Sequence, residues 1–145
     1  MKKGIAIAAL LLLAAVGAAA WMQYRATAPS SQVRLYRIGI LSRGRGSYEI
    51  AAKGFQERLR EFGYVEGHNI VYDVRYLSTP EELEKAANEF IAANVDLINT
   101  YSTPATKAAF NATQQAHKPI PVVFTSVADP VAAGVIESVE QPRTH

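Results

Sequence analysis

Small hydroxyl and carboxylate side chains recur in this sequence just after short apolar runs. Ser42 follows one such run, Ser102 and Thr103 follow a second, and Ser126 and Asp129 follow a third. Hydroxyls both donate and accept hydrogen bonds, and a carboxylate accepts them from ammonium or hydroxyl groups. If the fold gathers these residues, they are suited to holding a small polar ligand by hydrogen bonds.

The sequence Ser-Thr-Pro occurs twice, around Thr79 and around Thr103. Both copies predict helix starts with threonine as the N-cap, because the residue before proline avoids the helical region and proline suits the first turn. After Thr79, Glu82 completes a capping box. After Thr103 no acid lies in the first turn, and Lys107 adds positive charge. We expect this second start to be open to a ligand carboxylate. The alternative is ordinary capping by Thr103, with water on the remaining N–H groups.

The loop that begins at Ser42 is rich in glycine. Gly44 and Gly46 suggest a dinucleotide-binding motif, but Glu49 stands where the third glycine belongs, and its carboxylate would repel a pyrophosphate. We therefore exclude a nucleotide site. We expect a flexible loop that contacts a small ligand through Ser42 or Tyr48, and the alternative is a solvated turn.

The residues after the third apolar run have two interpretations. Asp129 either caps the helix expected after it or, like Ser126, receives a ligand ammonium or hydroxyl. Elsewhere the sequence offers little for catalysis: it has no cysteine, its three histidines lack metal-ligand spacing, and no Gly-x-Ser-x-Gly motif is present. We predict no enzymatic activity, no metal and no cofactor.

The amino-terminal segment accounts for the basic net charge of +2, because it holds three of the 15 basic residues and no acid. The body is then close to neutral, which gives no support to nucleic-acid binding. A positive start at Lys2 and Lys3, an uncharged Ala- and Leu-rich stretch and small residues at 18–20 and 26–28 predict a signal peptide. An uncleaved anchor is the alternative. Residues 1–28 are thus assigned as signal peptide or anchor and 29–34 as a linker, and both alternatives place the body in the periplasm or elsewhere outside the cytoplasm.

Strands and helices are expected to alternate four times along the body. Helices are expected to begin near Ser47, Thr79, Thr103 and Asp129, with Gly63 ending the first. The strands are expected at Leu35–Leu41, Ile70–Tyr76, Val95–Thr100 and Val122–Thr125.

Apolar spacing assigns an inward face to each helix. The four expected faces, in chain order, are Ala51, Phe55, Leu59 and Phe62; Leu83, Ala86, Ala87, Phe90 and Ile91; Ala105, Ala108, Ala109 and Ala112; and Val131, Val135, Ile136 and Val139.

The alternation predicts an α/β fold with a parallel sheet and helices on both faces. The second strand alternates like an edge strand and the fourth is almost wholly apolar like a central one, which favours the order 2-1-3-4. Ligands bind such sheets beyond the carboxyl ends of the strands, where the order reverses between strands one and three.

Four segments in order, "YRIGILS", "GFQERLREFGYVEGHNIVYDVRY", "AANVDLINTYSTPAT" and "PIPVVFTSVADPVAAGVIESV", resemble the ABC-transporter substrate-binding protein family that includes tryptophan- and tyrosine-type binding proteins. The resemblance runs from Tyr36 to Val139. It implies a flavodoxin-like first lobe (residues 35–139) of a two-lobed extracytoplasmic protein that closes on a solute such as an amino acid and delivers it to a membrane permease. By matching position, it implies ligand contacts at Ser42, Ser102, Thr103, Ser126 and Asp129.

The family continues after the fourth helix with a glycine-rich loop, a hinge and a second lobe. This sequence instead reads Glu140 to His145, so we expect an incomplete, one-lobe form with a truncated or unrelated tail at 140–145. The alternative function is a membrane-tethered sensory or interaction module that uses the same lobe without transport.

Overall fold

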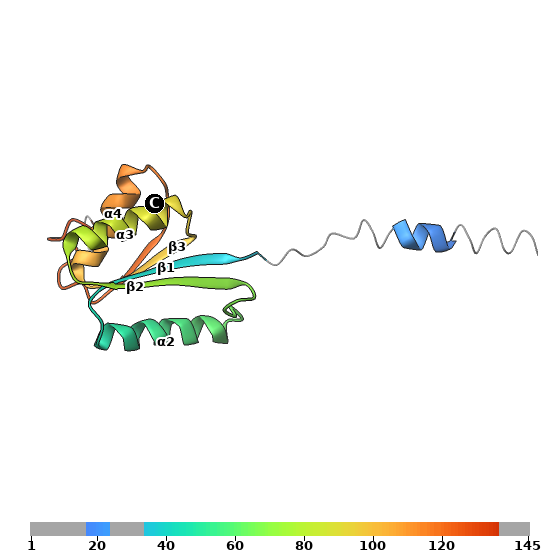
Figure 1. The fold of residues 1–145 in the computed structure, drawn as a ribbon, viewed down its shortest axis with the longest axis horizontal. Helices are drawn as coiled ribbons and strands as arrows, with labels where there is room; N and C mark the ends of the chain where they lie inside the picture. The colour runs from blue at the N-terminus through green and yellow to red at the C-terminus, as the bar shows by residue number, and fades with distance from the viewer. Residues whose placement is uncertain (1–16, 24–33, 137–145) are drawn as a thin grey trace, which may run out of the picture. The chain divides into compact units, whose positions relative to one another are not determined.

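The computed structural model describes residues 17–23 and 34–136 (Figure 1). The chain divides into two units, residues 1–32 and 33–145, and within the first, residues 17–23 are helical. Most of the predicted signal peptide or anchor, the linker at 29–33, Val139 and the tail at 140–145 lie outside the described residues. Within residues 17–23 and 34–136, no helix has both the length and the apolar character needed to cross a membrane.

The second unit alternates strand and helix, as predicted. All strands pair in parallel, and their order β2-β1-β3-β4 confirms the predicted order 2-1-3-4. The elements are β1 (Tyr36–Arg43), α2 (Ser47–Glu61), β2 (Ile70–Leu77), α3 (Pro80–Ala92), β3 (Leu97–Tyr101), α4 (Thr103–Gln115) and β4 (Val122–Thr125).

The sheet separates two apolar layers, with α2 on one face and α3 and α4 on the other (Figure 1). Successive side chains of β1 enter opposite layers, so Ile40 packs on the α2 side and Leu41 on the α3/α4 side. The four alanines predicted to face inward on α4 are all buried. Their small size lets this helix approach the sheet closely.

Gly39 in β1 is needed because the ring of Phe90 lies against it. A Cβ atom at Gly39 would lie 2.6 Å from Cδ2 of Phe90, and Phe90 is fully buried. We predict that Gly39→Ala destabilises the fold by about 1–3 kcal/mol, the usual cost of overpacking. Urea unfolding measures this change.

Gly54→Ala is the matched control. Gly54 lies inside α2 with nothing within 4 Å of its added Cβ. This substitution should stabilise the helix by about 0.5–1 kcal/mol. Equal urea midpoints for Gly39→Ala and the wild-type chain would contradict the packing argument.

The predicted inward face of α2 needs correction. Phe55 and Leu59 pack on the sheet as expected, but Phe62 is 64% exposed and Ala51 is exposed. Ala52 is buried in place of Ala51. A small rotation of the helix relates the two faces, and the packing of Tyr48 on this layer selects the observed one. The helix also starts differently, because Gly46 at φ 73° is its N-cap and Ser47, expected to cap it, is its first residue.

The expectation of a central, buried β4 is also corrected. This strand lies at one end of the described sheet, and its side chains are alternately half-buried and exposed, with Val123 44% exposed. The physical reason is that successive side chains of β4 point to opposite faces: Val122 packs on the α3/α4 layer, whereas no β4 residue belongs to the layer that α2 covers. An apolar composition shows that a strand can be buried, but its actual burial depends on the elements that pack against it.

The predicted fourth helix is absent from the described residues that follow β4. Residues 130–134 form turns. Gly134 has φ 73°, and the N–H of Val135 donates to the carbonyl of Pro130, which closes the chain after about one turn. The glycine therefore ends the helical path that the apolar spacing of Val131, Val135 and Ile136 had suggested.

Two carboxylates tie loops to the sheet and make stability depend on pH. The pKa of Glu82 is lowered because the N–H groups of Ser78 and Thr79 donate to it. The pKa of Asp96 is lowered mainly by the N–H of Arg37, 2.8 Å from its Oδ2. Their contribution is fully present above the ordinary values of 4.5 and 3.8. It is lost as the pH falls through the lowered values.

We predict that the double variant Glu82→Gln, Asp96→Asn is less stable than the wild-type chain near pH 7, because it lacks both carboxylates. The stability difference should shrink as the pH falls through the lowered pKa values of the two wild-type groups, because they then take up protons. Urea unfolding at a series of acidic pH values measures this. A difference that stays constant down the series would show that these carboxylates are not the acid-sensitive groups.

Candidate functional site

The carboxyl ends of β1, β3 and β4 lie side by side, and Ser102 is hydrogen-bonded to the last residue of β1 and to the last residue of β4. In the parallel register Ser42 is opposite Tyr101, and Tyr101 is opposite Thr125. Beyond them, the N–H of Arg43 donates to Oγ of Ser102 at 3.4 Å, and the N–H of Ser102 donates to the carbonyl of Thr125 at 3.3 Å. The loops that carry the predicted site residues therefore start from one edge of the sheet.

The two Ser-Thr-Pro sequences start their helices in different ways. At α3 the prediction is confirmed: Thr79 is the N-cap, its Oγ1 accepts from the N–H of Glu82, and the Glu82 carboxylate accepts from the N–H of Thr79. At α4 the predicted cap is wrong. Ser102 is the N-cap and Thr103 is the first helical residue.

The α4 start has neither an acid in its first turn nor a hydrogen bond from the side chain of its N-cap. The Ser102 hydroxyl is occupied by the N–H of Arg43, from a different strand. Among the described residues, no acceptor is found for the N–H groups of Thr103 and Ala105. The open helix start expected from the sequence is therefore present, although its first residue is shifted by one.

Ser42 and two aromatic rings adjoin this start. Ser42 is fully buried, and its hydroxyl oxygen has no hydrogen-bond partner among the described residues. The rings of Tyr48, from α2, and Tyr101, from β3, lie 6.4 Å apart between centroids and are inclined at 35°. Burial, followed by the charge of Tyr76, raises the pKa of Tyr101 to about 12.

The residues after β4 lie farther along the same edge. Ser126 directly follows Thr125 and is exposed, with φ 61°. Oδ1 of Asp129 accepts from the N–H groups of Val131 and Ala132, at 3.1 and 2.9 Å. Asp129 therefore caps a turn, whereas the helix that it was expected to cap is absent from the described residues. Contact of Ser126 or Asp129 with a ligand remains a prediction.

Two residues of this edge were not among the predicted site residues. Tyr101 lies at the end of β3, directly before Ser102, and it is buried in the layer on the α2 side. Thr106 lies three residues after Thr103, as Glu82 lies three residues after Thr79. It is fully buried, and its hydroxyl donates to the carbonyl of Ser102 at 3.0 Å. Aligning the two Ser-Thr-Pro sequences would have drawn attention to it.

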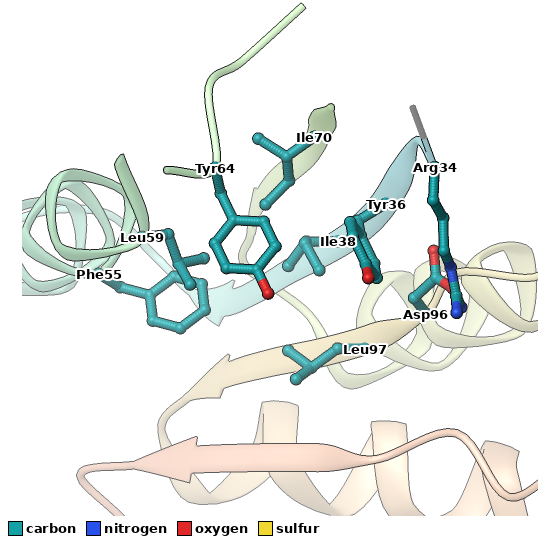
Figure 2. A pocket seen from close by; sticks show the side chains of 9 residues that line it. All are labelled: Arg34, Tyr36, Ile38, Phe55, Leu59, Tyr64, Ile70, Asp96 and Leu97. Atoms are coloured by element: carbon teal, nitrogen blue, oxygen red, sulfur yellow. The ribbon is translucent and has the colours of Figure 1, made fainter. Parts of the chain in front are cut away.

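A hollow of about 330 Å³ lies at the opposite, amino-terminal ends of β1 and β3, beside α2 (Figure 2). Its walls are mostly apolar, and its polar rim is the ion pair of Arg34 and Asp96, 2.7 Å apart. Asp96 also accepts from the N–H of Arg37, so its carboxylate is already well satisfied. With little free polar chemistry, and at the wrong end of a parallel sheet, this hollow is a poor candidate for a solute site.

Within the described ranges, no three His, Asp or Glu side chains are grouped closely enough to hold a metal ion. The chemistry available at the edge of the sheet is therefore that of hydroxyls, backbone N–H groups, aromatic rings and one carboxylate. Such groups bind and orient a ligand.

Comparison with known proteins identifies close relatives of this chain. Residues 42–145 match the family described as ABC transporter substrate binding protein. A tyrosine-binding protein from Clostridioides difficile (strain R20291) is 39% identical over 97 residues, which are 66% of this chain and 27% of that protein.

Solved structures agree with this match. A ligand-free, open structure of a substrate binding protein with adhesive properties from Clostridium difficile is 34% identical, with a TM-score of 0.69 over 74% of this chain and 36% of that chain. An ABC domain in complex with L-Trp from Streptococcus pneumonia has a TM-score of 0.67 at 24% identity over the same shares, which shows likeness of fold alone. The chain spans about a third of the length of these relatives.

Proposed function

The chain belongs to the ABC transporter substrate binding protein family, and from this premise we propose that it binds a small carboxylate-bearing solute, such as an aromatic amino acid, at the carboxyl ends of β1, β3 and β4. The observation that carries the proposal is the open start of α4 at the point where these strand ends meet. A helix start with free N–H groups attracts a carboxylate through hydrogen bonds and the helix dipole.

Each part of an aromatic amino acid has a partner at this edge. The carboxylate is assigned to the N–H groups of Thr103 and Ala105. The ring is assigned to the half-buried Tyr48, behind which the buried Tyr101 lies, since aromatic pairs contribute about 0.5–1.5 kcal/mol beyond the burial of their surface. The ammonium group is assigned to the oxygen of Asp129 that does not cap the turn. The 39% identity to a tyrosine-binding protein supports this solute class.

The wider role is part of the same proposal. The chain is exported by its amino-terminal segment and acts outside the cytoplasm. There it contributes the first lobe of a binding protein that passes its solute to an ABC permease. Substrate binding, rather than catalysis, is the role that the family description gives.

A panel of matched ligands tests the proposal. L-tyrosine, L-tryptophan and L-phenylalanine are compared with tyramine and tryptamine, which keep the ring and the ammonium group but lack the carboxylate. Saturation-transfer NMR on the full chain should detect binding of the amino acids and not of the amines. Equal signals from both sets would contradict recognition of the carboxylate by α4.

A further inference from the structure

The two Ser-Thr-Pro sequences differ at the position three residues after threonine. Glu82 reaches back to the N–H groups before its helix, whereas Thr106 is buried and donates its hydroxyl hydrogen to the carbonyl of Ser102. We propose that Thr106 is a positioning residue that holds the Ser102–Thr103 peptide so that its N–H group is presented to the solute. The ligand is that of the proposed function, on which this inference rests, and the mechanism rests on the hydrogen bonds of the Thr106 hydroxyl.

A directed chain of hydroxyl groups ends on the carbonyl of Ser102. Thr106 Oγ1 lies 3.0 Å from that carbonyl oxygen and 2.8 Å from Oγ1 of Thr100. A hydroxyl has one hydrogen, and that of Thr106 is donated to Ser102. Thr100 must therefore donate to Thr106. Both threonines are fully buried, so water does not compete, and hydrogen bonds in such a chain polarise and strengthen one another.

Fixing the carbonyl fixes the N–H group on the other side of the same peptide bond. The carbonyl of Ser102 also accepts from the N–H of Thr106 at 3.1 Å, so it is directed into the helix. In a planar trans peptide the C=O and N–H bonds point in opposite directions. The N–H of Thr103 is therefore directed out of the helix start. Pro104 has no N–H group, so the donor on Thr103 gains importance.

The backbone at this point needs such support. Ser102 has φ 88° and ψ 148°, a conformation that a residue with a side chain adopts only when its surroundings impose it. Its N–H is held by Thr125 and its hydroxyl by the N–H of Arg43, but neither bond acts on its carbonyl. Thr106 constrains the carbonyl through both its backbone N–H and its hydroxyl, and the hydroxyl is the part that a substitution can remove. Beside this peptide, the buried and unpartnered hydroxyl of Ser42 offers a further polar contact to a ligand at the same edge.

The test compares variants of the full chain in two measurements. Thr106→Val keeps the shape and removes the hydroxyl, whereas Thr106→Ser keeps the hydroxyl. Thr113→Val is the matched control, because the hydroxyl of Thr113 is also buried in α4 but donates to the carbonyl of Phe110, away from the site. Thr100→Val removes only the outer hydroxyl, and it provides the test if Thr106→Val does not fold.

The first measurement needs no ligand. Amide ¹⁵N relaxation should show a lower order parameter for Thr103 in Thr106→Val, an intermediate value in Thr100→Val, and the wild-type value in Thr106→Ser and Thr113→Val. If Thr103 remains as ordered in Thr106→Val and Thr100→Val as in the wild-type chain, the positioning role is overturned, whatever the chain binds.

The second measurement is an NMR titration with L-tryptophan. Thr106→Val should weaken binding about fivefold or more, the size expected for one lost hydrogen bond. Thr106→Ser should restore the wild-type affinity, and Thr113→Val should keep it even where it lowers the unfolding midpoint. Equal weakening by Thr113→Val would overturn the inference. A wild-type chain with no response to L-tryptophan would count against the proposed function, and the relaxation data would still decide the role of Thr106.

Discussion

Replacing Thr103 with glutamate should abolish binding of carboxylate solutes while leaving the fold intact. Thr103 is the first residue of α4 and is half-buried beside the N–H groups assigned to the ligand. A carboxylate attached there occupies the positive end of the helix from within the chain, as Glu82 does at α3. It also repels an incoming carboxylate. An NMR titration with L-tryptophan should therefore show no saturable shift changes.

Thr103→Gln separates charge from size. Its amide has the shape of glutamate without the negative charge, so binding should persist with a modest loss. Acid in the first turn of a helix is favourable, so the unfolding midpoint of Thr103→Glu should equal or exceed that of the wild-type chain. Undiminished affinity in Thr103→Glu would remove the α4 start from the site.

The second large effect concerns affinity itself. We predict that the 145-residue polypeptide binds aromatic amino acids with a dissociation constant above about 1 mM, equivalent to only ~4 kcal/mol. Small-molecule sites usually bury most of the ligand surface. The described lobe contacts a solute from one side only, so water competes for the polar groups on the other side. A two-lobed protein closes around its solute, and a single lobe cannot make this closing motion.

Calorimetry and NMR titrations with tryptophan, tyrosine, phenylalanine and the branched amino acids measure this affinity. The exposed side chains along β4, such as Val123 at 44%, should also favour self-association, which sedimentation would detect. Micromolar binding by a monodisperse monomer would show that this polypeptide is a complete binding unit, contrary to the expectation of a one-lobe, incomplete form.

Sequence patterns predicted most of the fold because the decisive signals were local. The capping box at Thr79, the glycine at the end of α2 and the alanine face of α4 each depend on residues within a few positions of one another. Strand order followed from the contrast between an alternating second strand and an apolar fourth one. The prediction that β4 is buried was wrong, because the burial of its side chains depends on which helices cover the two faces of the sheet.

The site was predicted less completely because its geometry depends on contacts between distant segments. The positive φ of Ser102 and the bond from Arg43 to its hydroxyl join residues about 60 positions apart. No local rule therefore shows that Ser102, rather than Thr103, caps α4. The partners of Thr106 are only four and six positions away, at Ser102 and Thr100, so an alignment of the two Ser-Thr-Pro sequences could have indicated it. The prediction of a fourth helix was wrong for a local reason: Gly134 has a positive φ and ends the helical path, although the apolar residues around it have helical spacing.

The most direct test of the central claim is a map of amide shift changes in the full chain during titration with L-tryptophan. The claim is that the solute binds at the carboxyl ends of β1, β3 and β4. It predicts changes concentrated at residues 42–48, 102–106 and 126–129. Changes centred instead on the hollow at the opposite end of the sheet, around Tyr36, Phe55 and Leu97, would contradict it, as would a titration without any shift change.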